Sequence, residues 1–262
     1  MIIGKGLLGK AIEKEIGDEF QDVIIHCAGK IGGIKYHQDN HTEILYNFNI
    51  DNDILNGVQP NDQVICFGSV CMYSPDVDIL REDNCCEGTL PYNAVYAMSK
   101  RVLRNRLLHM RANGIHTSFL ILTNLYGVSK YKGDNDHVIS SLLHKCLEAK
   151  KCGSPFEVWG DGKAEREFLF APDAAKVVHK VLKEGAGDLL ISPGVSTSIR
   201  EAAETIADVV NFDGDIVYNP DMPDDKTRKR TDTTNFRDQF PYFEFTPLRE
   251  GVKHCVSSLY QG

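Results

Sequence analysis

Tyr96 and Lys100 are the two residues of this chain whose types and spacing most directly suggest chemistry. Residues four apart on a helix share one face, so a helix here would bring the phenol and the ammonium together. A phenol has an unperturbed pKa of about 10, and a neighbouring ammonium lowers that pKa toward the range useful for proton transfer. The alternative for this spacing alone is a solvated helix on which Lys100 is only a surface charge.

The segment upstream of this helix favours the chemical interpretation. Residues 64–69 read VICFGS, an apolar strand that ends in a glycine and Ser69. In open α/β sheets, ligands bind at the carboxyl ends of the strands. We therefore expect Ser69 to share a site with Tyr96 and Lys100, although a strand-end serine can also simply bond to the backbone.

Strand and helix signals alternate along the chain, which is the pattern of a parallel sheet covered by helices. The predicted fold class is α/β, a doubly wound parallel sheet with a small C-terminal lobe. We expect strands at the opening MII and near 22–28, 62–68, 116–122 and 189–191. We expect helices near 10–16, 41–57, 92–113, 137–150 and 172–184, and one more that begins with a capping box at Ser198 and Glu201.

The composition excludes several classes of function. The 262 residues are 42% hydrophobic and 25% charged, as in an ordinary globular protein, and the net charge of -8 argues against nucleic acid as the main partner. The longest apolar runs fall far short of the roughly 20 residues of a membrane span, and the polar start is unlike a signal peptide. The eight cysteines form no CxxC pair, so we expect a reducing cytoplasm and no metal site.

The opening GKGLLG is a GxGxxG element placed between the first strand and the first helix. The backbone amides of such a loop, together with the helix N-terminus, can hold a pyrophosphate. The strand before it is short, and glycines also gather at helix starts that bind nothing. The motif alone therefore leaves both interpretations open.

A set of further motifs keeps one order and spacing along the chain. They are SVCMY at 69–73, YxxxK at 96–100, TNLYG at 123–127, DHVI at 136–139, WGxG at 159–162 and REFL at 166–169. From about Val23 to the C-terminus, the chain thereby resembles the extended short-chain dehydrogenases/reductases, and among them the GDP-L-fucose synthase family. The resemblance implies a Rossmann-type fold.

The resemblance also implies two reactions of a GDP-4-keto-6-deoxy sugar in one active site. The first inverts C3 and C5, because the ketone acidifies both neighbouring carbons through an enolate, and the second reduces the C4 ketone with NADPH. Inversion needs a base on one face and an acid on the other, and Cys71 and His137 match the family positions of this base and acid. Taken singly, Cys71 could be a buried small hydrophobe and His137 a capping or solvated residue.

The reduction gives roles to the residues of the opening paragraph. By resemblance, Tyr96 protonates the C4 oxygen as hydride arrives, Ser69 polarises it, and Lys100 also holds the nicotinamide ribose. The implied cofactor is NADP(H), with its preference over NAD(H) left open. The expected cofactor-binding residues are Gly4, Lys5, Gly6, Leu7, Leu8, Gly9, Ala28, Tyr96, Lys100, Leu122 and His137.

Five residues match family positions that contact the nucleotide sugar, namely Asn124, Lys145, Trp159, Arg166 and Lys229. Lys145 stands where the family usually has an arginine near the diphosphate, which keeps the charge but loses the bidentate fork. Trp159 lies in the segment that the family places by the guanine, or is plain core. Each of the three cations could instead be an ordinary surface charge. For Lys229, which lies in a charge-rich loop, this is the default interpretation.

The chain departs from the family pattern after its first helix. It passes directly into DVIIHCA at 22–28, which resembles the fourth strand of the family sheet. The second strand, its helix and the third strand are absent, a loss of about 30 residues or one βαβ step. This makes the first strand an edge, which should be very short or covered, and removes a wall of the adenosine pocket. Lys5 is the cation left in the loop. Its side chain could face either a 2′-phosphate or solvent.

The expected division is a shortened dinucleotide-binding domain at 1–127, with 168–192 returning to it, and a substrate-binding lobe at 128–167 and 193–262. Two other functions stay open. One is a reductase of another GDP-4-keto-deoxy sugar, such as a heptose, without epimerase activity. The other is a non-reducing nucleotide-sugar-binding protein or epimerase that has lost cofactor affinity. The resemblance also implies a homodimer that packs the helices near 41–57 and 92–113 of both subunits into a bundle.

Overall fold

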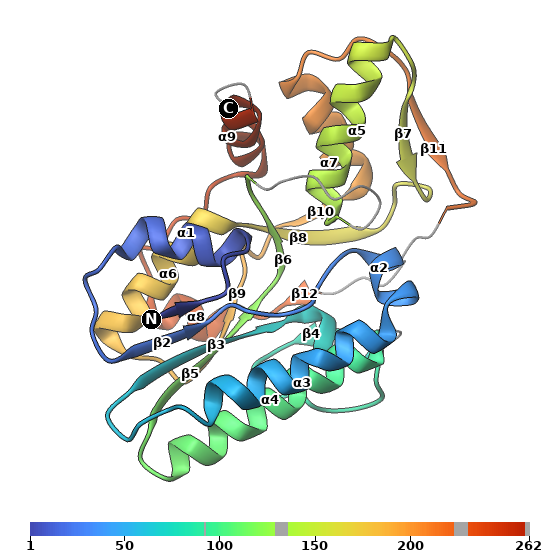
Figure 1. Cartoon of the computed structure of the whole chain (residues 1–262). Helices are drawn as coiled ribbons and strands as arrows, with labels where there is room; N and C mark the ends of the chain where they lie inside the picture. The colour runs from blue at the N-terminus through green and yellow to red at the C-terminus, as the bar shows by residue number, and fades with distance from the viewer. Residues whose placement is uncertain (92, 129–135, 223–229, 260–262) are drawn as a thin grey trace.

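The centre of the protein is a parallel sheet of five strands. The structure is a computed structural model that describes residues 1–91, 93–128, 136–222 and 230–259 (Figure 1). The sheet order is β1-β2-β3-β5-β9, and each neighbouring pair runs parallel. The strands are β1 (Ile2–Ile3), β2 (Val23–His26), β3 (Gln63–Ser69), β5 (His116–Leu122) and β9 (Asp188–Ile191). The predicted α/β fold class and these predicted strands are confirmed.

Strand β1 is an edge strand that pairs directly with β2, Ile2 opposite Ile25 and Ile3 opposite His26. Helix α1 (Leu7–Ile16) leads into β2 through the turn at 17–22. In the part of the chain that the structure describes, the sheet therefore has no strand beyond β1, as the sequence predicts. The edge is only two residues long, so it presents few free backbone groups to a foreign strand.

Helices cover both faces of the sheet (Figure 1). Helices α1 and α6 pack on one face, and α3 and α4 on the other. The central strand β3 alternates between the two cores: Ile65 and Phe67 face α1 and α6, whereas Val64 and Cys66 face α3 and α4. The helices span α3 His41–Leu55, α4 Ala94–Ala112 and α6 Ala171–Glu184, close to their predicted ranges.

A second group of elements lies beyond the carboxyl ends of the sheet strands (Figure 1). Helices α5, α7 and α9 share a core with strands β7 and β11, which pair in parallel. The capping box that begins α7 is confirmed, because Ser198 and Glu201 bond to each other's backbone N–H. The bounds are α5 Val138–Cys152, β7 Phe156–Trp159, α7 Ile199–Val209, β11 Ile216–Asn219 and α9 Leu248–Leu259.

Strands β6 (Asn124–Tyr126), β8 (Glu165–Phe170) and β10 (Ser196–Ser198) form a small sheet between the two groups. Helix α8 (Thr234–Gln239) returns to the main sheet, where Phe236 is buried in the core under α1 and α6. The division into two domains at the expected residue numbers stays a prediction. Among the described helices, none is long and apolar enough to cross a membrane.

Several short elements have no counterpart in the sequence analysis. Among them are helix α2 (Ile34–Asp39), the 3-10 turn η1 (Val70–Met72) and the strands β4 (Ile79–Leu80) and β12 (Arg230–Thr231). Strands β4 and β12 pair in parallel although about 150 residues separate them. Each is too short to show the periodicity from which helices and strands are predicted.

The loop between β1 and α1 depends on two glycines. A Cβ atom on Gly4 would lie 2.4 Å from the Ala28 nitrogen, and Gly4 has a φ of +103° that favours glycine. A Cβ atom on Gly9 would lie 1.8 Å from the Gly4 carbonyl oxygen. Gly6 differs, because nothing lies within 4 Å of the position of its Cβ.

We expect Gly9→Ala to destabilise the fold and Gly6→Ala to leave it nearly unchanged. The methyl group at Gly9 requires the Gly4 turn to move, and such overpacking costs about 1–3 kcal/mol. At Gly6 the methyl group has room, and the loss of an N-cap glycine costs less than about 1 kcal/mol. Denaturant unfolding of both variants measures the difference, and equal losses in the free energy of unfolding would contradict the close approach.

Candidate active site

The residues predicted for catalysis meet where β3 ends and α4 begins. Ser69 is the last residue of β3, and its side chain hydrogen-bonds the hydroxyl of Tyr96. The Ser69 Oγ also accepts a hydrogen bond from the backbone N–H of Cys71 at 3.2 Å, which caps the turn η1. Ser69 therefore makes both the backbone bond of the structural alternative and the contact with Tyr96 that the chemical interpretation requires.

The pKa of Tyr96 differs from the sequence-based expectation. The side chain is only 5% exposed, and burial raises the pKa of the phenol well above its usual value, with electrostatic interactions with Cys71 and Asp51 adding to the effect. The hydrogen bond with Ser69 acts in the opposite direction but does not offset burial. The predicted lowering of this pKa by Lys100 is therefore wrong, because desolvation dominates. Tyr96 is a neutral phenol with a proton to donate.

Lys100 lies one turn further along α4, as the spacing predicts. Its Nζ is 5.8 Å from the centre of the Tyr96 ring, and the side chain is buried. The charge of Lys100 also acts on Cys27, which directly follows β2 and whose pKa burial raises to about 12. The ammonium therefore lies near the carboxyl end of β2 as well as beside Tyr96, at the edge of the sheet where ligands of parallel sheets bind.

Cys71 and His137 approach this site from different elements. Cys71 is half-buried in η1 and interacts electrostatically with Tyr96. His137 is the N-cap residue of α5, in the second group of elements. Its charge acts on His37, whose ring lies against Tyr96 with the ring centroids 5.2 Å apart. The structure thus places Cys71 within electrostatic range of Tyr96, and His137 within electrostatic range of the histidine that contacts Tyr96.

His37 is a residue of this site that the sequence analysis misses. It lies on α2 and is 6% exposed. Burial, together with the charge of His137, lowers the pKa of its imidazole to about 4. The rule that ligands bind at the carboxyl ends of strands points to the segment after β2 as much as to the segment after β3. Applied to every strand, it would have drawn attention to this histidine.

The glycine loop has the space and the donors that a pyrophosphate needs. Gly6 is the N-cap residue of α1, and no described side chain caps the first amides of this helix. The space beside Gly6 is open, so a ligand can approach the backbone there. Helix N-termini bind phosphate groups through such amides. The predicted loop residues Gly4 to Gly9 therefore fit the diphosphate of a dinucleotide.

The remaining predicted cofactor residues have different surroundings. Ala28 follows β2 and lies directly against Gly4. Leu122 ends β5 opposite Ser69 in the register of the sheet. Lys5 forms an ion pair with Glu13 on the exposed surface of α1, which neither interpretation of Lys5 anticipated.

Two of the predicted substrate residues contact each other. Lys145 on α5 lies over the ring of Trp159 at the end of β7, with its Nζ 4.0 Å from the ring centre. Trp159 is half-buried, so it is not simply a core residue. A cation stacked on an aromatic ring is attracted by the ring quadrupole. The pair therefore forms a charged, aromatic surface in the lobe where the nucleotide is expected.

The other predicted substrate residues lie near β8. The Asn124 side chain donates to the Glu167 carbonyl oxygen at 3.3 Å, and Arg166 is a residue of β8. Lys229 lies outside the described residues. Thr231, which ends β12, donates its backbone N–H to the Glu167 carboxylate at 3.1 Å. Asn124 and Arg166 are thus brought together by the pairing of β6 with β8.

Known proteins resemble this chain in sequence and in fold. The profile of the NAD dependent epimerase/dehydratase family matches residues 6–190. GDP-L-fucose synthase of Escherichia coli (strain K12) is 30% identical, over 93% of this chain and 81% of the relative. A GDP-L-fucose synthetase from Naegleria fowleri, solved with NADP bound, has a TM-score of 0.87 at 24% identity, covering 99% of this chain and 91% of that one.

A GDP-mannoheptose C4 reductase from Campylobacter jejuni, also solved with NADP bound, has a TM-score of 0.82 at 22% identity. The match covers 100% of this chain and 97% of that one. These structural likenesses support the observed α/β fold. Together with the match over residues 6–190, they lead to one conclusion: the chain belongs to the NAD dependent epimerase/dehydratase family.

Proposed function

We propose that this chain is an NADP(H)-dependent enzyme of the GDP-L-fucose synthase type, which inverts C3 and C5 of a GDP-4-keto-6-deoxy sugar and reduces its C4 ketone. The observation that carries the proposal is the meeting of Ser69, Cys71, Tyr96 and Lys100 at one edge of the sheet, with His137 close by. The identity of 30% to the Escherichia coli GDP-L-fucose synthase supports the same class of substrate.

For the reduction, NADPH supplies the hydride when it is bound. Tyr96 retains its proton because burial raises its pKa. Its hydrogen bond with Ser69 brings two hydroxyl groups to one point, where both can donate to the oxygen of a C4 ketone. Tyr96 then transfers its proton as that oxygen gains negative charge, and Lys100 stabilises the phenolate left behind.

For the inversions, Cys71 as a thiolate removes the proton from the carbon next to the ketone, and His137 returns a proton to the opposite face. The two residues come from η1 and from the start of α5, on different groups of elements. A sugar ring bound between these groups would have one residue on each face. The same two residues serve C3 and C5, because both carbons adjoin the C4 ketone.

The cofactor site is proposed to hold the pyrophosphate and nicotinamide parts of NADP(H) more firmly than the adenosine part. The open space at Gly6 would accept the pyrophosphate, and the buried ammonium of Lys100 would bind the nicotinamide part. The wall that a full sheet provides beyond its first strand is absent from the described residues, where β1 is the edge. Lys5 must leave Glu13 before it can pair with a 2′-phosphate.

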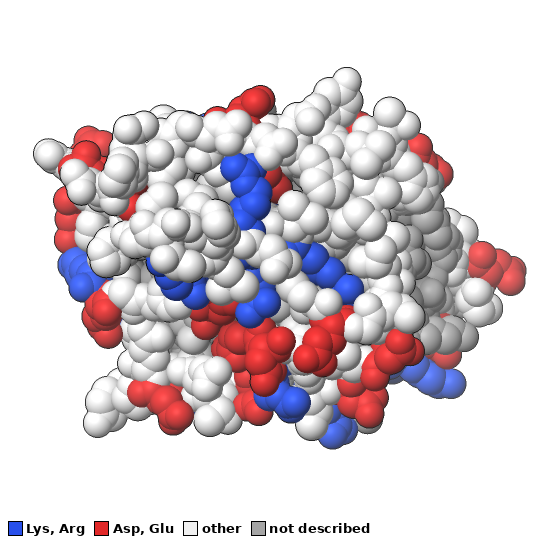
Figure 2. Space-filling model, turned by 90° about the horizontal axis from the view of Figure 1, so that it is seen from below, with Lys and Arg blue, Asp and Glu red and all other residues white. Residues whose placement is uncertain are grey.

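A cytoplasmic homodimer formed through α3 and α4 completes the proposal. Figure 2 shows the molecule from below, from the side on which these helices lie in Figure 1. Basic and acidic side chains lie side by side near the middle of this face, and wide areas carry no charge. Four large apolar side chains of the two helices are exposed, namely Leu45, Tyr46, Met98 and Val102. Specific interfaces bury about 800 Å² on each partner, so both helices would take part in the contact.

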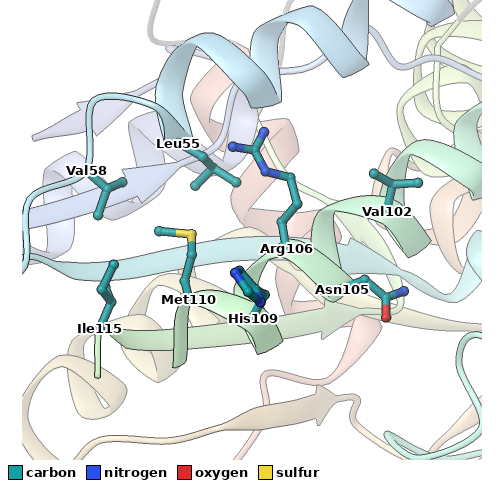
Figure 3. Close-up of a pocket in the computed structure, with 8 residues that line it drawn as sticks. All are labelled: Leu55, Val58, Val102, Asn105, Arg106, His109, Met110 and Ile115. Atoms are coloured by element: carbon teal, nitrogen blue, oxygen red, sulfur yellow. The ribbon is translucent and has the colours of Figure 1, made fainter. Parts of the chain in front are cut away.

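A hollow of about 490 Å³ continues this apolar face toward the far ends of the two helices. Leu55 and Val58 line it from the end of α3, and Val102, Arg106 and Met110 line it from α4 (Figure 3). Arg106 reaches across to hydrogen-bond Asn56 at 3.2 Å, which holds the two helices together. The hollow lies away from Tyr96 and therefore suits a protein contact better than the substrate.

We expect NADPH to bind, but more weakly than to a relative with a full sheet, because the adenosine wall is absent. Gly6→Val should weaken binding at least about tenfold, which corresponds to about 1.4 kcal/mol, since the side chain fills the space that the pyrophosphate needs. Isothermal titration calorimetry measures both affinities. Wild-type binding as tight as in a full-length relative would show that another segment replaces the wall, and no binding would favour a non-reducing protein.

Variants of Tyr96 and Cys71 should separate the two reactions. Tyr96→Phe removes the proton donor and should slow NADPH oxidation by about 10²–10⁴-fold. Cys71→Ser should bind cofactor but fail to exchange the C3 and C5 hydrogens with solvent deuterium, because a hydroxyl is a far weaker base than a thiolate. His137→Asn should permit exchange but impair inversion. Mass spectrometry and NMR of the sugar, incubated in D₂O without NADPH, measure exchange and configuration.

Cys152→Ser is the matched control, because Cys152 is an exposed free cysteine at the end of α5. This variant should keep wild-type exchange and wild-type NADPH oxidation. Wild-type exchange and inversion in both the Cys71 and the His137 variants would instead show that these two residues are not the base and the acid. A wild type that oxidises NADPH but exchanges neither hydrogen would identify a C4 reductase without epimerase activity.

We expect Val102→Glu to dissociate the homodimer, since it places a charge in the apolar face of α3 and α4. Val217→Glu is the matched control: Val217 is 46% exposed on β11, against 42% for Val102 on α4. Light scattering coupled to size-exclusion chromatography gives the molar masses. A monomeric wild type, or a dimer that survives Val102→Glu unchanged, would reject this interface.

A further inference from the structure

The imidazole of His37 is a buried polar group for which the fold alone gives no reason. It lies on α2, which follows the carboxyl end of β2, and is 6% exposed. Its Nδ1 has no hydrogen-bond partner among the described residues. A buried polar atom left unpaired costs about 1–3 kcal/mol. The position therefore carries a cost to stability that an apolar residue would avoid.

The surroundings of His37 are the groups assigned to catalysis. Its ring lies against the ring of Tyr96, with the centroids 5.2 Å apart and the planes tilted by 55°. The charge of His137 acts on it from the start of α5. His37 therefore contacts the proposed proton donor to the C4 oxygen and lies within electrostatic range of the proposed proton donor to carbon. A sugar that contacts both residues must pass close to this imidazole.

The protonation state determines what His37 can offer to a ligand. The ring hydrogen-bonds the backbone of Gly32 and Nδ1 has no partner, so Nε2 carries the proton and Nδ1 presents a lone pair. Burial and the charge of His137 lower the pKa to about 4, and the ring is neutral at neutral pH. It cannot serve there as a cation for the diphosphate. It can accept a hydrogen bond from a hydroxyl group.

We propose that His37 is a substrate-binding residue whose Nδ1 accepts a hydrogen bond from a hydroxyl group of the bound sugar, while its ring holds the phenol of Tyr96 in place. The inference rests on the proposed function and extends it to a residue outside the predicted set. The contact fixes the rotation of the sugar, so that its ketone faces Tyr96 and Ser69. The unpaired atom of the free protein then gains its partner when substrate binds.

His37→Phe and His37→Asn test this role in the full-length protein. Phenylalanine keeps an aromatic ring against Tyr96 but has no acceptor, whereas the amide oxygen of asparagine can occupy the position of Nδ1. With GDP-4-keto-6-deoxymannose and NADPH, we expect His37→Phe to lower kcat/KM for the sugar about 10–100-fold, the effect of a lost hydrogen bond of about 1–3 kcal/mol. We expect His37→Asn to recover most of this loss, and the KM for NADPH to stay within about twofold of wild type in both.

His116→Phe is the matched control, because His116 is an exposed histidine at the start of β5, at the end of the sheet opposite to Tyr96, and it should leave every constant unchanged. Wild-type kcat/KM in a folded His37→Phe variant would overturn the proposal. Equal losses in the Phe and Asn variants would also overturn it, because they would indicate a packing role. The KM for NADPH separates a loss of sugar binding from a loss of cofactor binding.

Nitrogen NMR of the wild-type protein with labelled histidine gives a measurement that depends on no variant. The Nδ1 resonance of His37 should move to lower frequency when the sugar is added without NADPH, as an unpaired ring nitrogen accepts a hydrogen bond. An unchanged resonance at saturating sugar would reject the contact. If the wild type binds the sugar but does not oxidise NADPH, the proposed function fails, and this resonance still decides the role of His37.

Discussion

The burial of strand β3 is the constraint on which the active site depends. The strand lies between β2 and β5, and its residues 64–66 are fully or almost fully buried. A shift by one residue would turn its apolar side chains to the wrong faces, so its register is strongly fixed. Ser69 is thereby held opposite Leu122 at the end of the sheet. Gly68 permits this packing, because a Cβ atom there would lie 2.6 Å from the Phe119 ring.

The buried carboxylate of Glu167 connects the end of the main sheet with the small sheet of β6, β8 and β10. Glu167 on β8 accepts hydrogen bonds from the hydroxyl of Ser192, directly after β9, and from the backbone and hydroxyl of Thr231 on β12. A carboxylate buried without such donors would be very costly. Its three bonds therefore fix how β8 and β12 lie relative to the end of the sheet. Arg166 and Asn124, beside Glu167, take their positions from the same connection.

The sequence predicts the helices and strands that show a regular hydrophobic pattern. It also predicts which residues share one face of a helix, because that follows from their spacing. Tyr96 and Lys100 are such a pair, and the absent strands follow from the short distance between the first helix and the segment of β2. Helix α2 has six residues, too few to show helical periodicity, so His37 was missed with it. The pKa of Tyr96 depends on burial by residues distant in the sequence, and the pairing of Lys5 with Glu13 depends on how the loop turns into α1. Neither can be predicted from local spacing.

The two-residue edge strand changes which half of a nicotinamide cofactor determines recognition. With β2 on one side and no described strand on the other, β1 offers little surface to an adenine ring. Two groups remain, the loop at Gly6 and the ammonium of Lys100. They can bind a phosphate and a nicotinamide riboside. Reduced nicotinamide mononucleotide contains both of these parts. It should therefore compete with the dinucleotide far better here than in an enzyme with a complete sheet, so that truncated biomimetic cofactors become usable reductants for this scaffold.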